Sequence, residues 1–193
     1  MPTEKYVLAI DLGTSGCKTA LVSVHGRVAA RCFHAVDTRI LPGGGAEQDP
    51  DDWWNALLTS CKELIDRDVV PRETIVALCC STPGEGTVAV DAQGHHLMNA
   101  ILWMDARGAG HLREIIGGLI ELRGYHPYKL LRWIRLTGGA PSTTGKDPAS
   151  HMLFIKHAYP DIYERTHKFL NVLDYLNFRL TGRLLATYDS VLT

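Results

Sequence analysis

The sequence predicts an α/β domain with a mixed sheet, whose first three strands are antiparallel and which is flanked by helices. Three apolar runs, at residues 6–10, 19–24 and 28–34, follow one another near the N-terminus with brief polar connections between them. Apolar runs joined by such short turns are typical of consecutive β-hairpins. A well-marked helix comes next, and we expect further strands and helices after it.

The first helix is indicated by its capping signals. Asp49 suits the N-cap, Pro50 suits the first helical position, and Asp51 and Asp52 complement the positive end of the helix dipole. The residues that follow place a continuous apolar face toward a core. This face consists of Trp53, Trp54, Leu57, Leu58, Cys61, Leu64 and Ile65. The Pro-Gly-Gly-Gly run at 42–45, just before this helix, predicts a loop without regular structure.

The rest of the chain alternates strands with helices. The apolar runs predict a buried strand at 75–80, a strand at 87–90 closed by a turn at 91–94, and a strand at 100–104. Helices are predicted over 147–158 and 173–180, ended by Pro160 and Gly182. Three antiparallel strands, a helix and then more strands and helices is the order of a ribonuclease-H-like fold.

Composition excludes several functional classes. The 193 residues carry a net charge of −1, so no basic field is available to hold a nucleic-acid backbone. No apolar run approaches the roughly 20 residues of a membrane helix, and the N-terminus does not resemble a signal peptide. The five cysteines show no Cys-x-x-Cys spacing, which favours free thiols in a reducing cytoplasm.

The stretch "AIDLGTSGCKTALV" at residues 9–22 carries the strongest chemical signal. Asp11 ends the first strand, where its carboxylate can face a cleft. A carboxylate beside a phosphate site needs a reason, because like charges repel, and a bound Mg²⁺ that neutralises the phosphates supplies one. A plain hairpin with a glycine turn and an exposed aspartate explains the same residues equally well.

The residues after Asp11 are suited to phosphate. Gly13 and Gly16 lack Cβ atoms, so the backbone can turn sharply and approach a ligand closely. Thr14 and Ser15 add hydroxyl donors, and Lys18 adds a point charge. The spacing therefore predicts a phosphate cradle between the first two strands.

Four segments together resemble the FGGY carbohydrate kinases, within the actin/hexokinase/Hsp70 group of ATPases. The first, "DLGTSGCKTALVS", is similar to the first phosphate motif of that group. The others are "EQDPDDWW" (47–54), "NAILWMDARG" (99–108) and "HMLFIKHAYPDIYERTHKFLNVLDYLNFRLTG" (151–182). They occur in the order of the family, which includes xylulokinases, glycerol kinases and ribulokinases, and the resemblance covers essentially the whole chain.

The resemblance implies a nucleotide site at the first hairpin. Asp11 would hold Mg²⁺ and its water. The ATP phosphates would lie against Gly13, Thr14 and Ser15, and Lys18 falls at a position that is often basic in the family. The cofactors implied are ATP and Mg²⁺, and the partner is a small sugar or polyol. A homodimer is a further expectation, because family members often dimerise.

The resemblance also implies three substrate contacts. Glu85 falls where glycerol kinases place an acid that binds substrate hydroxyls, and an exposed loop glutamate is its alternative reading. Trp103 would pack on the sugar ring, with core packing as its alternative. Asp105 would accept from hydroxyls or cap the following helix, while Arg107 would pair with an acid.

The sugar-contact segment departs from both relatives, so the substrate does not follow from the resemblance. Xylulokinases usually show Gly-Gln-Met-His where this chain has "TPGE" at 82–85, and glycerol kinases have an arginine where this chain has Gly84.

The resemblance further predicts that residues 1–193 form a truncated N-terminal domain. The catalytic aspartate would lie beyond Thr193, and the C-terminal domain would be absent. We therefore expect the chain alone to have little or no kinase activity.

Two competing hypotheses remain. "APSTTGKD" at 140–147 nearly matches a P-loop through Gly145 and Lys146, but Asp147 replaces the hydroxyl that would bind Mg²⁺. The second hypothesis is a non-catalytic module that binds a sugar or a nucleotide.

Overall fold

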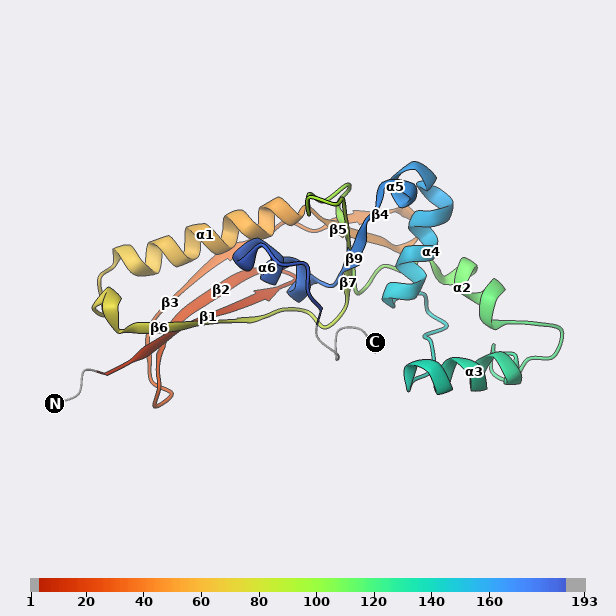
Figure 1. Cartoon of the computed structure of the whole chain (residues 1–193), viewed down its shortest axis with the longest axis horizontal. Helices are drawn as coiled ribbons and strands as arrows, with labels where there is room; N and C mark the ends of the chain where they lie inside the picture. The colour runs from red at the N-terminus through yellow and green to blue at the C-terminus, as the bar shows by residue number, and fades with distance from the viewer. Residues whose placement is uncertain (1–3, 187–193) are drawn as a thin grey trace. The chain divides into compact units, whose positions relative to one another are not determined.

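The computed structural model describes residues 4–186 of the chain (Figure 1). The chain divides into two compact units, each with its own β-sheet. The first unit comprises Met1–Thr38 and Asp49–Pro83, and the second comprises Arg39–Gln48 and Gly84–Thr193.

The first unit contains a four-stranded mixed sheet. Its strands are β1 (Tyr6–Gly13), β2 (Gly16–Ser23), β3 (Val28–Ala35) and β6 (Ile75–Ser81), in the spatial order β3-β2-β1-β6. β1 pairs antiparallel with β2, β2 pairs antiparallel with β3, and β6 runs parallel to β1. The predicted order of three antiparallel strands within a mixed sheet is confirmed, and β1 and β2 extend up to the turn that joins them.

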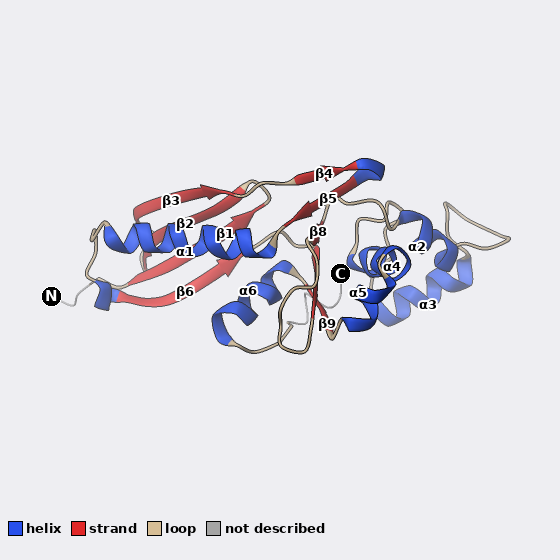
Figure 2. Cartoon of the chain, turned by 90° about the horizontal axis from the view of Figure 1, so that it is seen from above, coloured by secondary structure: helices blue, strands red, loops and turns tan. Residues whose placement is uncertain are grey.

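Helix α1 (Pro50–Asp66) covers one face of this sheet, as Figures 1 and 2 show. The predicted cap is present, because the Asp49 side chain accepts a hydrogen bond from the backbone N–H of Asp51 at 2.9 Å. The apolar face of the helix is buried through Trp53, Leu57 and Leu64. A short 3₁₀ turn, η2 (Arg72–Thr74), then leads into β6.

The strands of this sheet divide their side chains between two faces with a period of two. Residues such as Leu12 and Leu21 are buried on the face toward α1, whereas Asp11 and Lys18 are exposed. The alternation follows from the pleat of a β-strand, which sends successive side chains to opposite sides.

One expectation about β6 is wrong. Its apolar sequence predicts a buried strand, yet Val76 is 53% exposed and Leu78 is 45% exposed. Within the described part of the chain, β6 lies at the edge of the sheet and pairs with β1 alone. The sequence of a continuous apolar strand does not show whether the strand lies at the centre or at the edge of a sheet.

The second unit contains a five-stranded sheet. Its strands are β4 (Arg39–Leu41), β5 (Gly45–Gln48), β7 (Gly86–Val90), β8 (Ala100–Leu102) and β9 (Lys168–Leu170), in the order β4-β5-β8-β7-β9. Every neighbouring pair in this sheet is antiparallel. The predicted loop at 42–45 is corrected here, because Pro42–Gly44 forms a 3₁₀ turn, η1, and Gly45 already belongs to β5.

Helices make up most of the remainder of the second unit. They are α2 (Ala109–Ile116), α3 (Pro127–Thr137), α4 (Pro148–Ala158), α5 (Pro160–Arg165) and α6 (Val172–Thr181). The helix predicted over 147–158 is α4, whose N-cap is Asp147, and Gly182 ends α6 as the sequence predicts. The core of the unit includes Ala89, Ile101 and Ile155, all fully buried. No helix within residues 4–186 is long and apolar enough to cross a membrane.

Candidate functional site

The Asp11 and Lys18 side chains lie together on the exposed face of the first sheet. They occupy directly opposed positions on β1 and β2. Lys18 Nζ lies 3.4 Å from Asp11 Oδ2, and the two side chains are 62% and 54% exposed, respectively. An exposed ion pair of this length contributes little to stability, so these charges are available to a ligand.

The two glycines of the hairpin have different structural roles. Gly16 has φ +148°, and a Cβ there would lie 2.3 Å from the carbonyl oxygen of His34, so the fold itself requires glycine. At Gly13 the nearest atom to an added Cβ is the carbonyl oxygen of Gly16, at 3.7 Å. Packing within the described chain therefore does not explain Gly13, and its bare backbone remains open to a ligand.

Thr14 and Ser15 form the two-residue turn between β1 and β2. The segment after β3 holds this turn in place: Val36 N donates to Ser15 O at 3.2 Å, and Thr38 Oγ1 donates to Thr14 O at 3.3 Å. Both carbonyl oxygens of the turn therefore accept hydrogen bonds that hold the turn in place. Bracing of this kind favours binding, because the turn does not have to be ordered when a ligand arrives.

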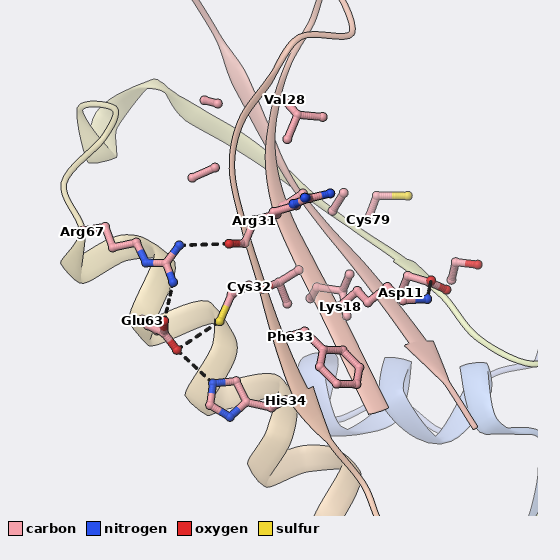
Figure 3. A pocket seen from close by; sticks show the side chains of 17 residues that line it. Asp11, Lys18, Val28, Arg31, Cys32, Phe33, His34, Glu63, Arg67 and Cys79 are labelled. Carbon is pink, nitrogen blue, oxygen red and sulfur yellow. Dashed lines mark hydrogen bonds and ion pairs between the residues drawn. The ribbon is translucent and has the colours of Figure 1, made fainter. Parts of the chain in front are cut away.

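Asp11 and Lys18 line a cavity of about 1100 Å³ in the first unit. Figure 3 shows a second polar group in the same cavity, between β3 and α1, made of Cys32, His34, Glu63 and Arg67. Ser81, at the end of β6, lies directly opposite Asp11 in the parallel ladder and also lines the cavity.

The donor set beside the hairpin fits a metal–nucleotide ligand. A carboxylate oxygen is the ligand type that Mg²⁺ prefers, and a lysine ammonium suits a phosphate. The open space at Gly13 permits close approach of phosphate oxygens to the backbone. When bound, Mg²⁺ would neutralise phosphate charge. The residues that would hold the ion and the phosphates are Asp11 and Lys18, with the Gly13–Ser15 backbone.

The second unit has a cavity of its own, of about 510 Å³, and Glu85 lines it. The wall also includes the indole of Trp133 and the carboxylates of Asp147 and Asp174. Burial, and secondarily the negative charge of Asp147, raise the pKa of Glu85. Carboxylates accept hydrogen bonds from hydroxyl groups, and an indole packs against the C–H face of a sugar ring, so the cavity suits a polyhydroxylated ligand.

Trp103 and Asp105 are not among the residues that line this cavity. Trp103 is 44% exposed, whereas Asp105 is 1% exposed. The reading of Asp105 as a helix cap is wrong, because α2 begins at Ala109 and Gly108 occupies its N-cap position. A direct contact between either residue and substrate stays a prediction.

Asp105 takes part in a buried ionic network with Arg107 and Glu47. Arg107 Nη2 lies 2.7 Å from Asp105 Oδ2 and 2.7 Å from Glu47 Oε1. Asp105 Oδ2 also accepts from the backbone N–H of Ala46 at 2.9 Å. Burial opposes the charge of Arg107, but hydrogen bonds from the guanidinium to Asp105 and Glu47 outweigh it and raise the pKa of Arg107. The network ties the segment after β8 to β5.

The structure does not support a P-loop at 140–147. A P-loop follows a strand, whereas helix α3 precedes this segment. At Gly145 an added Cβ would lie 2.4 Å from the backbone nitrogen of Ala109, so close packing against the start of α2 explains this glycine.

Sequence reasoning missed the contributions of Trp133, Asp147 and Asp174 to the cavity of the second unit. Asp147 carries a local signal, but that signal is the helix cap. Trp133 lies on α3 and Asp174 on α6, and no short-range pattern relates either residue to Glu85.

The sheet order and the charged glycine hairpin define the class of the protein as an α/β domain with the ribonuclease-H-like (actin-like) fold. The chain matches the FGGY family of carbohydrate kinases, N-terminal domain, over residues 6–191. It is 32% identical to the xylulose kinase of Bacillus subtilis over 185 residues, which is 96% of this chain and 35% of the relative. The chain therefore belongs to the FGGY family of carbohydrate kinases, as the four segments predicted.

Solved structures show the same fold. A "xyloylose kinase" from Brucella ovis superposes with a TM-score of 0.78 at 26% identity, over 91% of this chain and 34% of that protein. A gluconate kinase from Lactobacillus acidophilus superposes with a TM-score of 0.80 at 22% identity, over 98% of this chain and 36% of that protein. The chain thus spans about 35% of the length of its relatives.

Proposed function

We propose that the protein carrying this chain transfers a phosphoryl group from ATP to a hydroxyl of a small sugar or polyol. The observation that carries the proposal is the geometry of the first hairpin. Asp11 and Lys18 lie side by side on an exposed sheet face, next to a braced turn whose Gly13 has no packing role within the described chain. Family membership supports the same reaction class.

The hairpin supplies charge and position, which are the main demands of phosphoryl transfer. Lys18 places a positive charge near the phosphates. Asp11 supplies a hard oxygen ligand for Mg²⁺, and the turn at Thr14 and Ser15 supplies hydroxyl groups and close backbone. Because these groups are already in place, little reorganisation accompanies binding.

The acceptor sugar belongs in the cavity lined by Glu85. Trp133 offers an apolar face, and Asp147 and Asp174 add hydroxyl acceptors to that of Glu85. The relatives named above act on xylulose and on gluconate, which supports a sugar or sugar derivative without selecting one.

Full turnover requires a general base within hydrogen-bond reach of the attacking hydroxyl. The family resemblance assigns that base to a position beyond Thr193, and the chain spans about 35% of its relatives. We therefore propose that residues 1–193 bind nucleotide weakly and turn over little or no substrate. An ATP-consumption assay with pentoses, pentuloses and polyols tests this, and robust turnover by the 193-residue chain would contradict it.

Nucleotide binding is tested by titrating the chain with Mg-ATP and following backbone amide shifts by NMR. The expected result is a set of shifts confined to the hairpin at residues 11–18. Lys18→Ala should weaken binding about tenfold, or about 1.4 kcal/mol. Lys62→Ala is the matched control, because Lys62 is an exposed lysine on α1. If Lys146→Ala abolished binding while Lys18→Ala did not, the P-loop reading would replace this proposal.

A further inference from the structure

Cys32, His34 and Glu63 bring sulfur, nitrogen and oxygen donors together on the α1 face of the first sheet, opposite the face that carries Asp11 and Lys18. Cys32 and His34 are two residues apart on β3, so the pleat directs both side chains toward α1. Cys32 Sγ lies 3.0 Å from Glu63 Oε2, and His34 Nε2 lies 3.0 Å from the same oxygen. Figure 3 shows the three groups converging between strand and helix.

Arg67 orients the Glu63 carboxylate through the oxygen that does not face Cys32 and His34. Arg67, one helical turn further along α1, pairs with Glu63 Oε1 and also donates to the backbone carbonyl of Arg31 at 2.9 Å. This leaves Oε2 directed at Cys32 and His34. Carboxylates that bind metal ions in proteins are usually oriented by hydrogen bonds from neighbouring groups.

We propose that Cys32, His34 and Glu63 bind a borderline-soft divalent cation, with Zn²⁺ as the best fit. One ligand atom from each residue lies within 4.8 Å of the other two. Tetrahedral zinc with ordinary bond lengths separates its ligand atoms by roughly 3.4–3.6 Å. The observed 3.0 Å contacts therefore need to open by only about half an ångström, which side-chain rotation on a half-exposed surface allows.

Charge and coordination number support the assignment. A thiolate and a carboxylate neutralise a divalent cation, and the sulfur ligand selects zinc over magnesium or calcium. Three protein ligands leave a fourth position for water. His34 is 33% exposed and Glu63 is 42% exposed, so solvent reaches the site.

When the metal–sulfur bond forms, the Cys32 thiol proton leaves to water.

A bound ion would cross-link α1 to β3. Strand and helix are already joined here by hydrogen bonds through Glu63. Replacing these with metal–ligand bonds stabilises the folded first unit in proportion to ion occupancy, because the unfolded chain does not hold the three donors together. Zinc should therefore raise the melting temperature of the wild-type chain.

The proposal is tested by titrating the reduced chain with Co²⁺, a spectroscopic substitute for zinc, and then displacing it with Zn²⁺. The expected result is a thiolate-to-cobalt charge-transfer band in the near ultraviolet, at a stoichiometry of one. Cys32→Ser should abolish the band, and His34→Ala should weaken binding at least tenfold, since even outer-shell partners contribute roughly 10–100-fold. Zinc should not raise the melting temperature of Cys32→Ser, and at equal concentration it should raise that of His34→Ala less than that of the wild type.

Cys79→Ser is the matched control. Cys79 is an exposed thiol that lines the same cavity, and its β6 position pairs with Ala9 on the face of Asp11. The control should bind cobalt as the wild type does. Absence of the band in the wild type, its persistence in Cys32→Ser, or its loss in Cys79→Ser would each overturn the proposal. Glu63 would then serve only as a hydrogen-bonded clamp between helix and strand.

Discussion

Removing the guanidinium of Arg107 should destabilise the second unit strongly. Arg107 Nη2 contacts Glu47 and Asp105 at 2.7 Å each, and Arg107 Nε donates to Asp105 Oδ2 at 3.0 Å. The Arg107, Glu47 and Asp105 side chains are only 11%, 10% and 1% exposed. Arg107→Ala would therefore leave two carboxylates in a largely dry environment without a counter-charge.

The expected loss is about 4 kcal/mol in the free energy of unfolding. Breaking a buried ion pair by removing one partner costs about 3–5 kcal/mol. The guanidinium also lies 4.3 Å from the ring centroid of Phe154, and that contact is lost with it. With a urea slope of about 2 kcal/mol per molar, the unfolding midpoint should fall by about 2 M.

Urea unfolding followed by circular dichroism measures this loss. Arg113→Ala is the control, because Arg113 is an exposed arginine on α2, and it should shift the midpoint very little. Arg107→Lys should recover only part of the loss, because an ammonium cannot bridge both carboxylates with the geometry of a guanidinium. Adding Glu47→Gln to Arg107→Ala should restore part of the lost stability, since one of the two unpaired charges is removed. A loss below about 1 kcal/mol for Arg107→Ala would refute the reasoning.

Four further predictions each concern a single residue. Gly16→Ala should cost about 3 kcal/mol, because its Cβ would lie 2.3 Å from the His34 carbonyl oxygen at φ +148°. Gly13→Ala should have the free energy of unfolding of the wild type in urea titrations but should lose Mg-ATP binding. Equal stability of Gly13→Ala and Gly16→Ala would contradict the different roles assigned to the two glycines. Asp147→Ala removes the α4 cap and should lower the free energy of unfolding by about 1 kcal/mol in urea titrations. Burial lowers the pKa of His151 from 6.5, so stability should fall as pH drops below that value, and His151→Gln should remove this component of the pH–stability curve.

Much of the first unit was predictable, because its signals are local. The hairpin run from β1 to β3 follows from apolar runs with short turns. The start of α1 follows from Asp49 and Pro50, and Gly13 and Gly16 mark the turn that joins β1 to β2. Each signal depends on residues close together in sequence, so no knowledge of distant contacts is needed. The position of Asp11 on β1, just before this turn, also follows from residues close to it in sequence.

Tertiary structure alone revealed which distant side chains meet. Arg107 and Glu47 are 60 residues apart, and they pair because β5 and β8 are neighbours in a sheet. Glu63 reaches His34 across 29 residues because α1 packs on β3. Such contacts depend on strand order and helix docking, which minimise exposed apolar surface over a whole unit. A local sequence pattern predicts whether a segment forms a helix or a strand. The partners of its polar side chains depend on where every other segment packs.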